Sequence, residues 1–201
     1  MANETSIANG ALVKLGQQLI TSINDSSSNA ANICKERISN AKEVVLTSFP
    51  FNGAVSRVTL AADVATPAYD YSNQFTLPSD CLRLITVEPA FADTDYALEG
   101  RKILFSGDTL EIIYIKNITD YNELDPLVNE SISCYLAYDI AYLITNDNQT
   151  TERMMQMYEK TIKKAKAANN RQLKKLSFYA ANWSDARLVG GYPSQYPTPT
   201  T

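Results

Sequence analysis

The side chains of this chain that could carry acid–base chemistry are carboxylates, because its 201 residues include no histidine. Six acids fall within one short stretch and could supply a carboxylate pair of the kind that glycosidases use. They are Asp80, Glu88, Asp93, Asp95, Glu99 and Asp108. Nothing in the sequence fixes their separation in space, and we interpret them as surface acids in turns. Without histidine there is no Ser–His–Asp triad, Cys–His pair or histidine metal ligand.

No other motif supplies catalytic chemistry. The sequence contains no GxGxxG, Walker A or GxSxG segment, so we expect neither an enzyme nor a cofactor. Cys34, Cys81 and Cys134 are widely spaced and form no CxxC pair, so we expect no metal site. The three thiols should be reduced, buried and structural.

The clearest charge feature is a basic segment over residues 160–175, which contains no acid. Its positive side chains are Lys160, Lys163, Lys164, Lys166, Arg171, Lys174 and Lys175. The whole chain has a formal net charge of −4, so the rest of it is strongly acidic. Three interpretations of the segment stay open: a solvated helix face, an interface with an acidic face of another subunit, or a helix that lies along nucleic-acid phosphates.

The hydrophobic pattern divides the chain into parts that would position these side chains. Residues 1–50 predict two helices, and residues 51–118 change to short alternating strands with glycine-containing turns. Residues 119–188 predict two long helices, and residues 189–201 predict an extended arm. The expected fold class is α+β: a four-helix bundle with an inserted small antiparallel sheet or sandwich and a C-terminal arm.

The helices have recognisable limits. The first should be capped by Thr5 or Ser6 and end near Gly16, and the second should span residues 29–48. The third should begin at Asp125-Pro126 and end near Ile144. Because the third helix is apolar on more than one face, we expect it to be the central buried helix.

The fourth predicted helix is long for a domain of this size. We expect a cap at Thr150 or Thr151 and a helix over residues 151–180, which would span about 45 Å. Its buried seam should consist of Met155, Tyr158, Ile162, Ala165 and Asn169. Part of such a helix should project from its own subunit or pack on a neighbour.

The C-terminal segment has features suited to contact with a partner. Trp183 lies near the junction of the fourth helix and the arm, where we expect it to pack. The arm carries a doubled Tyr-Pro, and its candidate contact residues are Tyr192, Pro193, Tyr196 and Pro197. Two glycines precede these prolines and would act as a hinge.

Several local motifs together resemble a known family. The first helix carries Asn-Gly-Ala-Leu-Val-Lys-Leu-Gly over residues 9–16, and the second ends in Ser-Phe-Pro-Phe-Asn over residues 48–52. The strand region contains Phe-Thr-Leu-Pro-Ser-Asp-Cys-Leu-Arg over residues 75–83, before two long helices. Across about residues 5–175 this order is similar to the head-to-tail adaptors of short-tailed bacteriophages, also called tail tubular protein A or the gatekeeper.

This resemblance implies a non-enzymatic cyclic homo-oligomer, usually a dodecamer, at the head–tail junction of the virion and assembled in the cytoplasm of the host bacterium. The ring would lie between the portal protein and the tail nozzle protein, and DNA would pass through its channel without specific binding. Carried over to this chain, residues 150–188 and the arm are candidate portal contacts. The turns at 89–95, 99–101 and 106–108 are candidate contacts to the nozzle or to adjacent subunits.

A second function class stays open beside this one. The chain could be a nucleic-acid-binding module that uses the basic helix at residues 160–175, and it would then bind DNA tightly and with strong salt dependence. A membrane protein is not expected, because no stretch of 18 apolar residues occurs.

Overall fold

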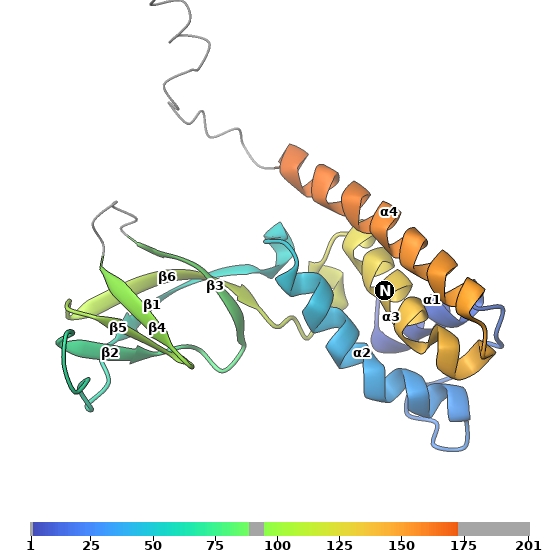
Figure 1. Cartoon of the computed structure of the whole chain (residues 1–201), viewed down its shortest axis with the longest axis horizontal. Coiled ribbons are helices and arrows are strands. Elements are labelled where there is room, and N and C mark those ends of the chain that lie inside the picture. Colours follow the sequence, from blue (N-terminus) through green and yellow to red (C-terminus); the bar gives the residue numbers. More distant parts are fainter. Residues whose placement is uncertain (1, 89–94, 173–201) are drawn as a thin grey trace, which may run out of the picture.

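The molecule is elongated, with helices at one end and strands at the other (Figure 1). The structure is a computed structural model that describes residues 2–88 and 95–172. It confirms a mixed α/β fold with four helices and small antiparallel sheets. The helices are α1 (Glu4–Lys14), α2 (Asn29–Thr47), α3 (Pro126–Thr145) and α4 (Asn148–Gln172).

The strands form two three-stranded antiparallel sheets. One sheet has the order β1–β6–β3 and the other has the order β2–β5–β4. The strand bounds are β1 (Val55–Ala61), β2 (Asn73–Thr76), β3 (Cys81–Glu88), β4 (Tyr96–Glu99), β5 (Lys102–Phe105) and β6 (Thr109–Lys116). Short 3-10 turns, η1 (Asn52–Ala54) and η2 (Tyr121–Glu123), join the strands to the helices.

The helices and the sheets enclose separate hydrophobic cores. α3 packs against the other three helices, and its buried Ile132, Leu136 and Ile140 lie in the helical core. α3 is therefore the central helix that its apolar pattern predicts. Phe75 and Ile103 from one sheet share the second core with Ile112 from the other. Strand β6 links the two, because its Ile115 belongs to the helical core.

The first helix starts earlier than the sequence suggested. The N-cap is Asn3, not Thr5 or Ser6, and a capping box forms because Asn3 and Ser6 each accept the other's backbone N–H. The helix closes at Gly16, whose φ of 69° is left-handed, with bonds from the amides of Gly16 and Gln17 to the carbonyls of Val13 and Leu12. This pattern is a Schellman motif, which favours glycine.

The fourth helix differs from expectation at its start and in its seam. It begins at Asn148, because Asp147 accepts the backbone N–H groups of Gln149 and Thr150 and so takes the capping role expected of Thr150 or Thr151. The buried methionine is Met154, while Met155 is only partly buried. The seam continues through Ile162, Ala165 and Asn169, as predicted. Residues 173–180 of the predicted helix lie outside the described part.

No helix in the part of the chain that the structure describes has the length and apolarity needed to span a membrane.

Candidate interaction surfaces

The outward face of α4 is basic and open to solvent. Lys160, Lys163, Lys164 and Arg171 are all exposed. The ion pairs within the described residues, Lys14–Glu130 and Arg37–Asp139, do not involve this face. Lys166 differs, because it is half-buried and its Nζ lies 5.7 Å from the centre of the Phe49 ring. Five of the seven predicted basic residues therefore lie on α4.

The remaining partner candidates cannot be placed. Lys174, Lys175, Trp183, Tyr192, Pro193, Tyr196 and Pro197 lie outside the described residues.

The C-terminal end of α4 stays bound to its own subunit as far as residue 172. Asn169 is buried within the seam, and its Oδ1 accepts the backbone N–H of Asn52 at 2.8 Å. Gln172 exchanges 3.4 Å bonds with the side chains of Asn52 and Asp125. The projection expected of this helix does not occur within the described residues, because these polar contacts tie it to the junction between α2 and β1.

The face around the N-terminus is hollowed and acidic, and sequence reasoning missed it. Glu4 and Asp120 line a hollow of about 480 Å³, and among the described residues its lining contains no lysine or arginine. Bonds from the backbone and side chain of Asn122 lower the pKa of Asp120, which keeps that carboxylate charged. The only sequence signal was the polar segment of residues 120–125 between β6 and α3.

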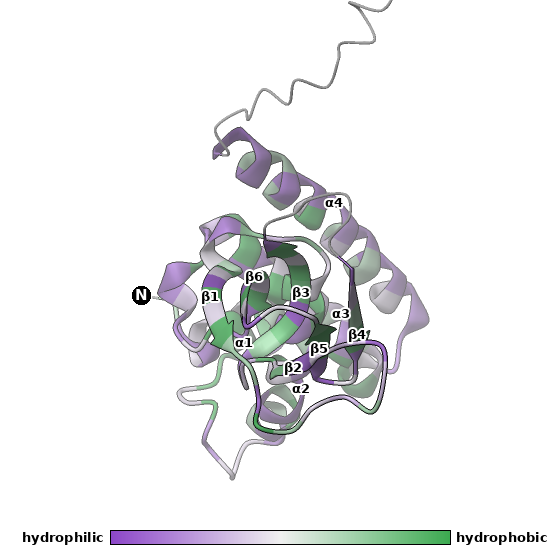
Figure 2. Cartoon of the chain, turned by 90° about the vertical axis from the view of Figure 1, so that its left-hand side faces the viewer, coloured by the Kyte–Doolittle hydropathy of each residue, from purple (hydrophilic) through white to green (hydrophobic). Residues whose placement is uncertain are grey.

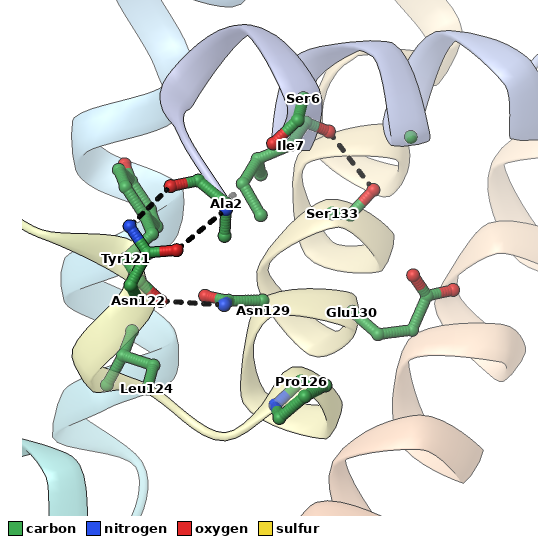
Figure 3. A pocket seen from close by; sticks show the side chains of 11 residues that line it. Ala2, Ser6, Ile7, Tyr121, Asn122, Leu124, Pro126, Asn129, Glu130 and Ser133 are labelled. Carbon is green, nitrogen blue, oxygen red and sulfur yellow. Dashed lines mark hydrogen bonds between the residues drawn. The ribbon is translucent and has the colours of Figure 1, made fainter.

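A second hollow of about 470 Å³ adjoins the first and lies between α1, η2 and α3 (Figure 3). The backbone of Ala2 is held across it by Asn122, which donates to the Ala2 carbonyl and accepts its N–H. Asn129 uses its Nδ2 to bond the Tyr121 carbonyl at 2.8 Å. The Asn129 Oδ1 and the Tyr121 hydroxyl are buried and have no hydrogen-bond partner among the described residues.

Close beneath these hollows lies a buried lysine. Lys42 of α2 is 8% exposed and donates from Nζ to the Ile118 carbonyl at 2.8 Å. Its Nζ also lies 5.7 Å from the centre of the Tyr121 ring. Burial lowers the pKa of Lys42, and the nearby charges of Glu4 and Glu43 act in the opposite direction. The side chain ties α2 to the segment that leaves β6.

The two ion pairs named above fix α1 and α2 against α3. Arg37 of α2 bonds both carboxylate oxygens of Asp139, at 2.6 and 2.8 Å. Lys14 of α1 lies 3.1 Å from Glu130 and also bonds Ser133. These contacts are partly buried and hold α1 and α2 against α3, so we assign them a role in stabilising the fold.

In the described part of the chain, two acids of the strand region bond tyrosine hydroxyls. Asp95 accepts the Tyr71 hydroxyl, Asp80 accepts the Tyr114 hydroxyl, and Asp93 lies outside the described residues. Across the described ranges, no three acids or cysteines group as a metal site would require. Cys34, Cys81 and Cys134 are free and buried, as predicted.

Large apolar side chains are exposed at both ends of the molecule. Val13, Leu19, Tyr142 and Leu143 are more than half exposed and belong to the helical end. The sheet end exposes Val64, Tyr69 and Leu98, of which Leu98 is on β4, at an edge of its sheet.

Comparison with known proteins identifies no relative: neither the models of protein families nor the curated proteins searched include a match to this chain.

Proposed function

We propose that this protein is a structural head-to-tail adaptor of a tailed bacteriophage. It would form a cyclic homo-oligomer, expected to be a dodecamer, between portal and tail nozzle, and the ring would continue the DNA channel. The proposal starts from the resemblance of its motifs to that family. Within it, the four helices act as a bundle that packs against its copies, and the C-terminal arm reaches the portal.

The observation that carries the proposal is the division of the subunit into two ends with separate cores. The helical end presents exposed Tyr142 and Leu143 together with the basic face of α4. The sheet end projects away from it and presents its own apolar side chains (Figure 1). Such a subunit can close a ring through one end and leave the other for the next tail component.

Attachment would then depend on repetition around the ring. Each subunit offers small contacts, and a ring of identical copies meets a ring-shaped partner many times at once. Multivalent binding of this kind converts weak single contacts into stable attachment. The mechanism is geometric, and it needs no catalytic group.

Electron microscopy of the purified protein mixed with portal rings from the same phage tests this function. The expected result is a second ring stacked coaxially on one end of the portal. Portals that stay bare beside free protein would contradict the proposal. So would particles that lack this protein yet carry tails and retain their DNA.

The rival function is nucleic-acid binding through α4. The exposed Lys160, Lys163, Lys164 and Arg171 favour it, because a basic helix can lie along phosphates. It predicts DNA binding that weakens steeply as salt rises. The adaptor proposal predicts weak DNA binding, since a conduit must release the DNA that passes through it.

A further inference from the structure

Four positive side chains of α4 lie in a row along the helix. Arg153, Lys160, Lys164 and Arg171 are exposed and follow one another at intervals of 7, 4 and 7 residues. These intervals keep all four on one edge of a helix, opposite the buried seam at Ile162 and Ala165. The exposed acids Glu152 and Glu159 lie on another edge of the helix. We call these four residues the basic stripe.

A matching acidic surface exists on the same chain. Glu4 and Asp120 line the first hollow beside the N-terminus, and no lysine or arginine of the described residues lines it. We call this hollow the acidic hollow. It adjoins the second hollow, where Asn129 is 8% exposed and its buried Oδ1 accepts no hydrogen bond from the described residues. The exposed Glu4 and Asp120 place two carboxylates in the acidic hollow, which suits long cationic side chains.

The stripe and the hollow face different sides of the subunit. Seen along the long axis, the N-terminus lies on the left and α4 runs along the upper right (Figure 2). α4 contacts α3 extensively and makes few contacts with α1. A subunit therefore cannot bring its own stripe into its own hollow.

We propose that the basic stripe of one copy docks against the acidic hollow of the next copy. Two complementary faces on different sides of one chain make a heterologous contact, which generates a ring when the rotation closes. The inference rests on the proposed ring function and specifies the contact between its subunits. It leaves the residues after 172 free to meet the portal.

A second copy fits the stripe better than DNA does. DNA would account for the positive charges on α4 but not for the two exposed carboxylates of the acidic hollow. The described part of the basic segment, residues 160–172, also contains no aromatic side chain on which a single strand could stack. Complementary faces of opposite charge account for both features together.

Charge reversal at each face tests the contact. One variant carries Lys160→Glu and Lys164→Glu, and the other carries Glu4→Lys and Asp120→Asn. Asparagine keeps the oxygen that accepts the Asn122 N–H, so the turn at η2 stays capped. We expect each variant alone to raise the protein concentration at half-assembly by about tenfold or more, measured by mass photometry and sedimentation.

Mixing the two variants gives a sharper readout. In a ring of either variant alone, each mutated face meets a wild-type face of the same charge. In a ring where the two variants alternate, the reversed stripe of one copy meets the reversed hollow of the next, and the other contacts join two wild-type faces. We therefore expect equimolar mixing to restore even-numbered rings that contain both variants. High salt should weaken wild-type rings, because the charges at this interface are exposed.

Controls separate this contact from folding and from overall charge. Lys35→Glu with Arg83→Glu changes the net charge by the same amount as the stripe variant, at exposed sites elsewhere, and should assemble like wild type. Circular dichroism checks folding, and Lys160→Gln with Lys164→Gln is the milder variant if the reversal unfolds the chain.

Three outcomes would overturn the inference. They are unchanged assembly of both variants, no recovery on mixing, or loss of DNA binding by the stripe variant while its rings stay intact. The last would assign the stripe to nucleic acid. Stacking on the portal tests the proposed function separately from these outcomes. Rings that assemble as described but do not stack on the portal would contradict the proposed function and leave this contact in place.

Discussion

At the scale of single residues, Lys42 shows how the helical end holds a charged side chain. Its amine reaches the Ile118 carbonyl, which is itself inside the core where β6 turns toward α3. Leaving such a carbonyl without a donor is costly in a dry environment. A lysine on the second helix gave no sequence signal of this role, because burial depends on which element packs above it.

We expect Lys42→Met to lower the free energy of unfolding by about 1–3 kcal/mol at pH 7, because methionine fills the space but cannot donate to Ile118. Urea denaturation measures the change, and Lys35→Met on the exposed side of α2 is the control.

The pKa of Lys42 is lowered in the folded state. The unfolded chain therefore binds more protons just below pH 10.5, and stability rises with pH in that window.

The gap in unfolding free energy between wild type and Lys42→Met should accordingly widen as pH approaches 10.5 from below. The cysteines and tyrosines that both proteins share titrate alike, so their contributions cancel in the difference between the two unfolding free energies. A gap that stays constant or shrinks would contradict the burial of this amine.

The cysteines should be inert in the native state. Burial raises the pKa of Cys34 to about 11 and also raises the pKa values of Cys81 and Cys134. Since the thiolate is the reactive form, we expect less than one thiol per chain to react with a disulfide reagent at pH 8, and three after unfolding in urea. Rapid reaction of one thiol in the folded protein would contradict this.

The same shift has a consequence for stability. The folded pKa of Cys34 lies above its ordinary value of 9.0, so its contribution to stability is complete below pH 9 and is lost as pH rises through about 11. Cys34→Ala should show a smaller loss of stability over that window than wild type.

At the scale of elements, the contact between α1 and α3 depends on a small residue. A Cβ added at Gly10 would lie 2.6 Å from the Ser133 Oγ, which donates to the Ile7 carbonyl. The two helices approach closely at this glycine, and a larger residue there would displace the Ser133 side chain. Lys14 and Glu130 then bridge the same pair of helices.

Gly10→Ala should destabilise the chain by about 1–3 kcal/mol, the range for inserting a carbon into a packed site. Ser133→Ala removes the clashing oxygen, so the double variant Gly10→Ala/Ser133→Ala should lose less stability than the two single variants together. Urea denaturation of all four proteins measures this coupling. Simple additivity would contradict the close approach.

Much of the element pattern could be read from the sequence, and the failures have physical reasons. The helical period predicts one face of α2 from Cys34, Ile38, Ala41, Val45 and Phe49, and all but the half-buried Phe49 are buried. The pattern also predicts strands over residues 55–61 and 102–105, and β1 and β5 have these limits. The seam of α4 began at Met154 and not Met155, because the angle between two helices decides which residue faces inward.

The candidate surfaces were less accessible to sequence reasoning. The basic segment was visible, since its charges are adjacent in the chain. The acidic hollow was not, because Glu4 and Asp120 lie far apart in sequence and meet only when α1 packs beside η2. Asn169 could be placed in the seam, but its bond to the Asn52 backbone required the fold.

At the scale of the whole molecule, the two cores meet chiefly at β6, and Leu82 of β3 also packs against the helical core. Arg57 pairs with Ile113 and Val55 pairs with Ile115 near the end of β1 and β6 that adjoins the helices. Ile115 is fully buried in the helical core, whereas Ile112 belongs to the core between the sheets. Few side chains of the strand region therefore belong to the helical core, and the remainder of that region has its own hydrophobic support.

Replacing residues 58–112 by Asn-Gly tests this independence. The dipeptide joins Arg57 to Ile113 as a two-residue hairpin turn and keeps the pairs that contain Val55 and Ile115. We expect the shortened chain to keep its helical circular dichroism and unfold cooperatively, because the core around α3 is retained. Ile115→Ala in the full chain is the matched control and should weaken the helical end by about 2–5 kcal/mol through a cavity.

If the adaptor proposal holds, the shortened chain should still stack on portal rings but no longer recruit the nozzle, since only the sheet end is missing. A shortened chain without cooperative unfolding would mean that the helices depend on the sheets, and one that still recruits the nozzle would move that contact to the helical end.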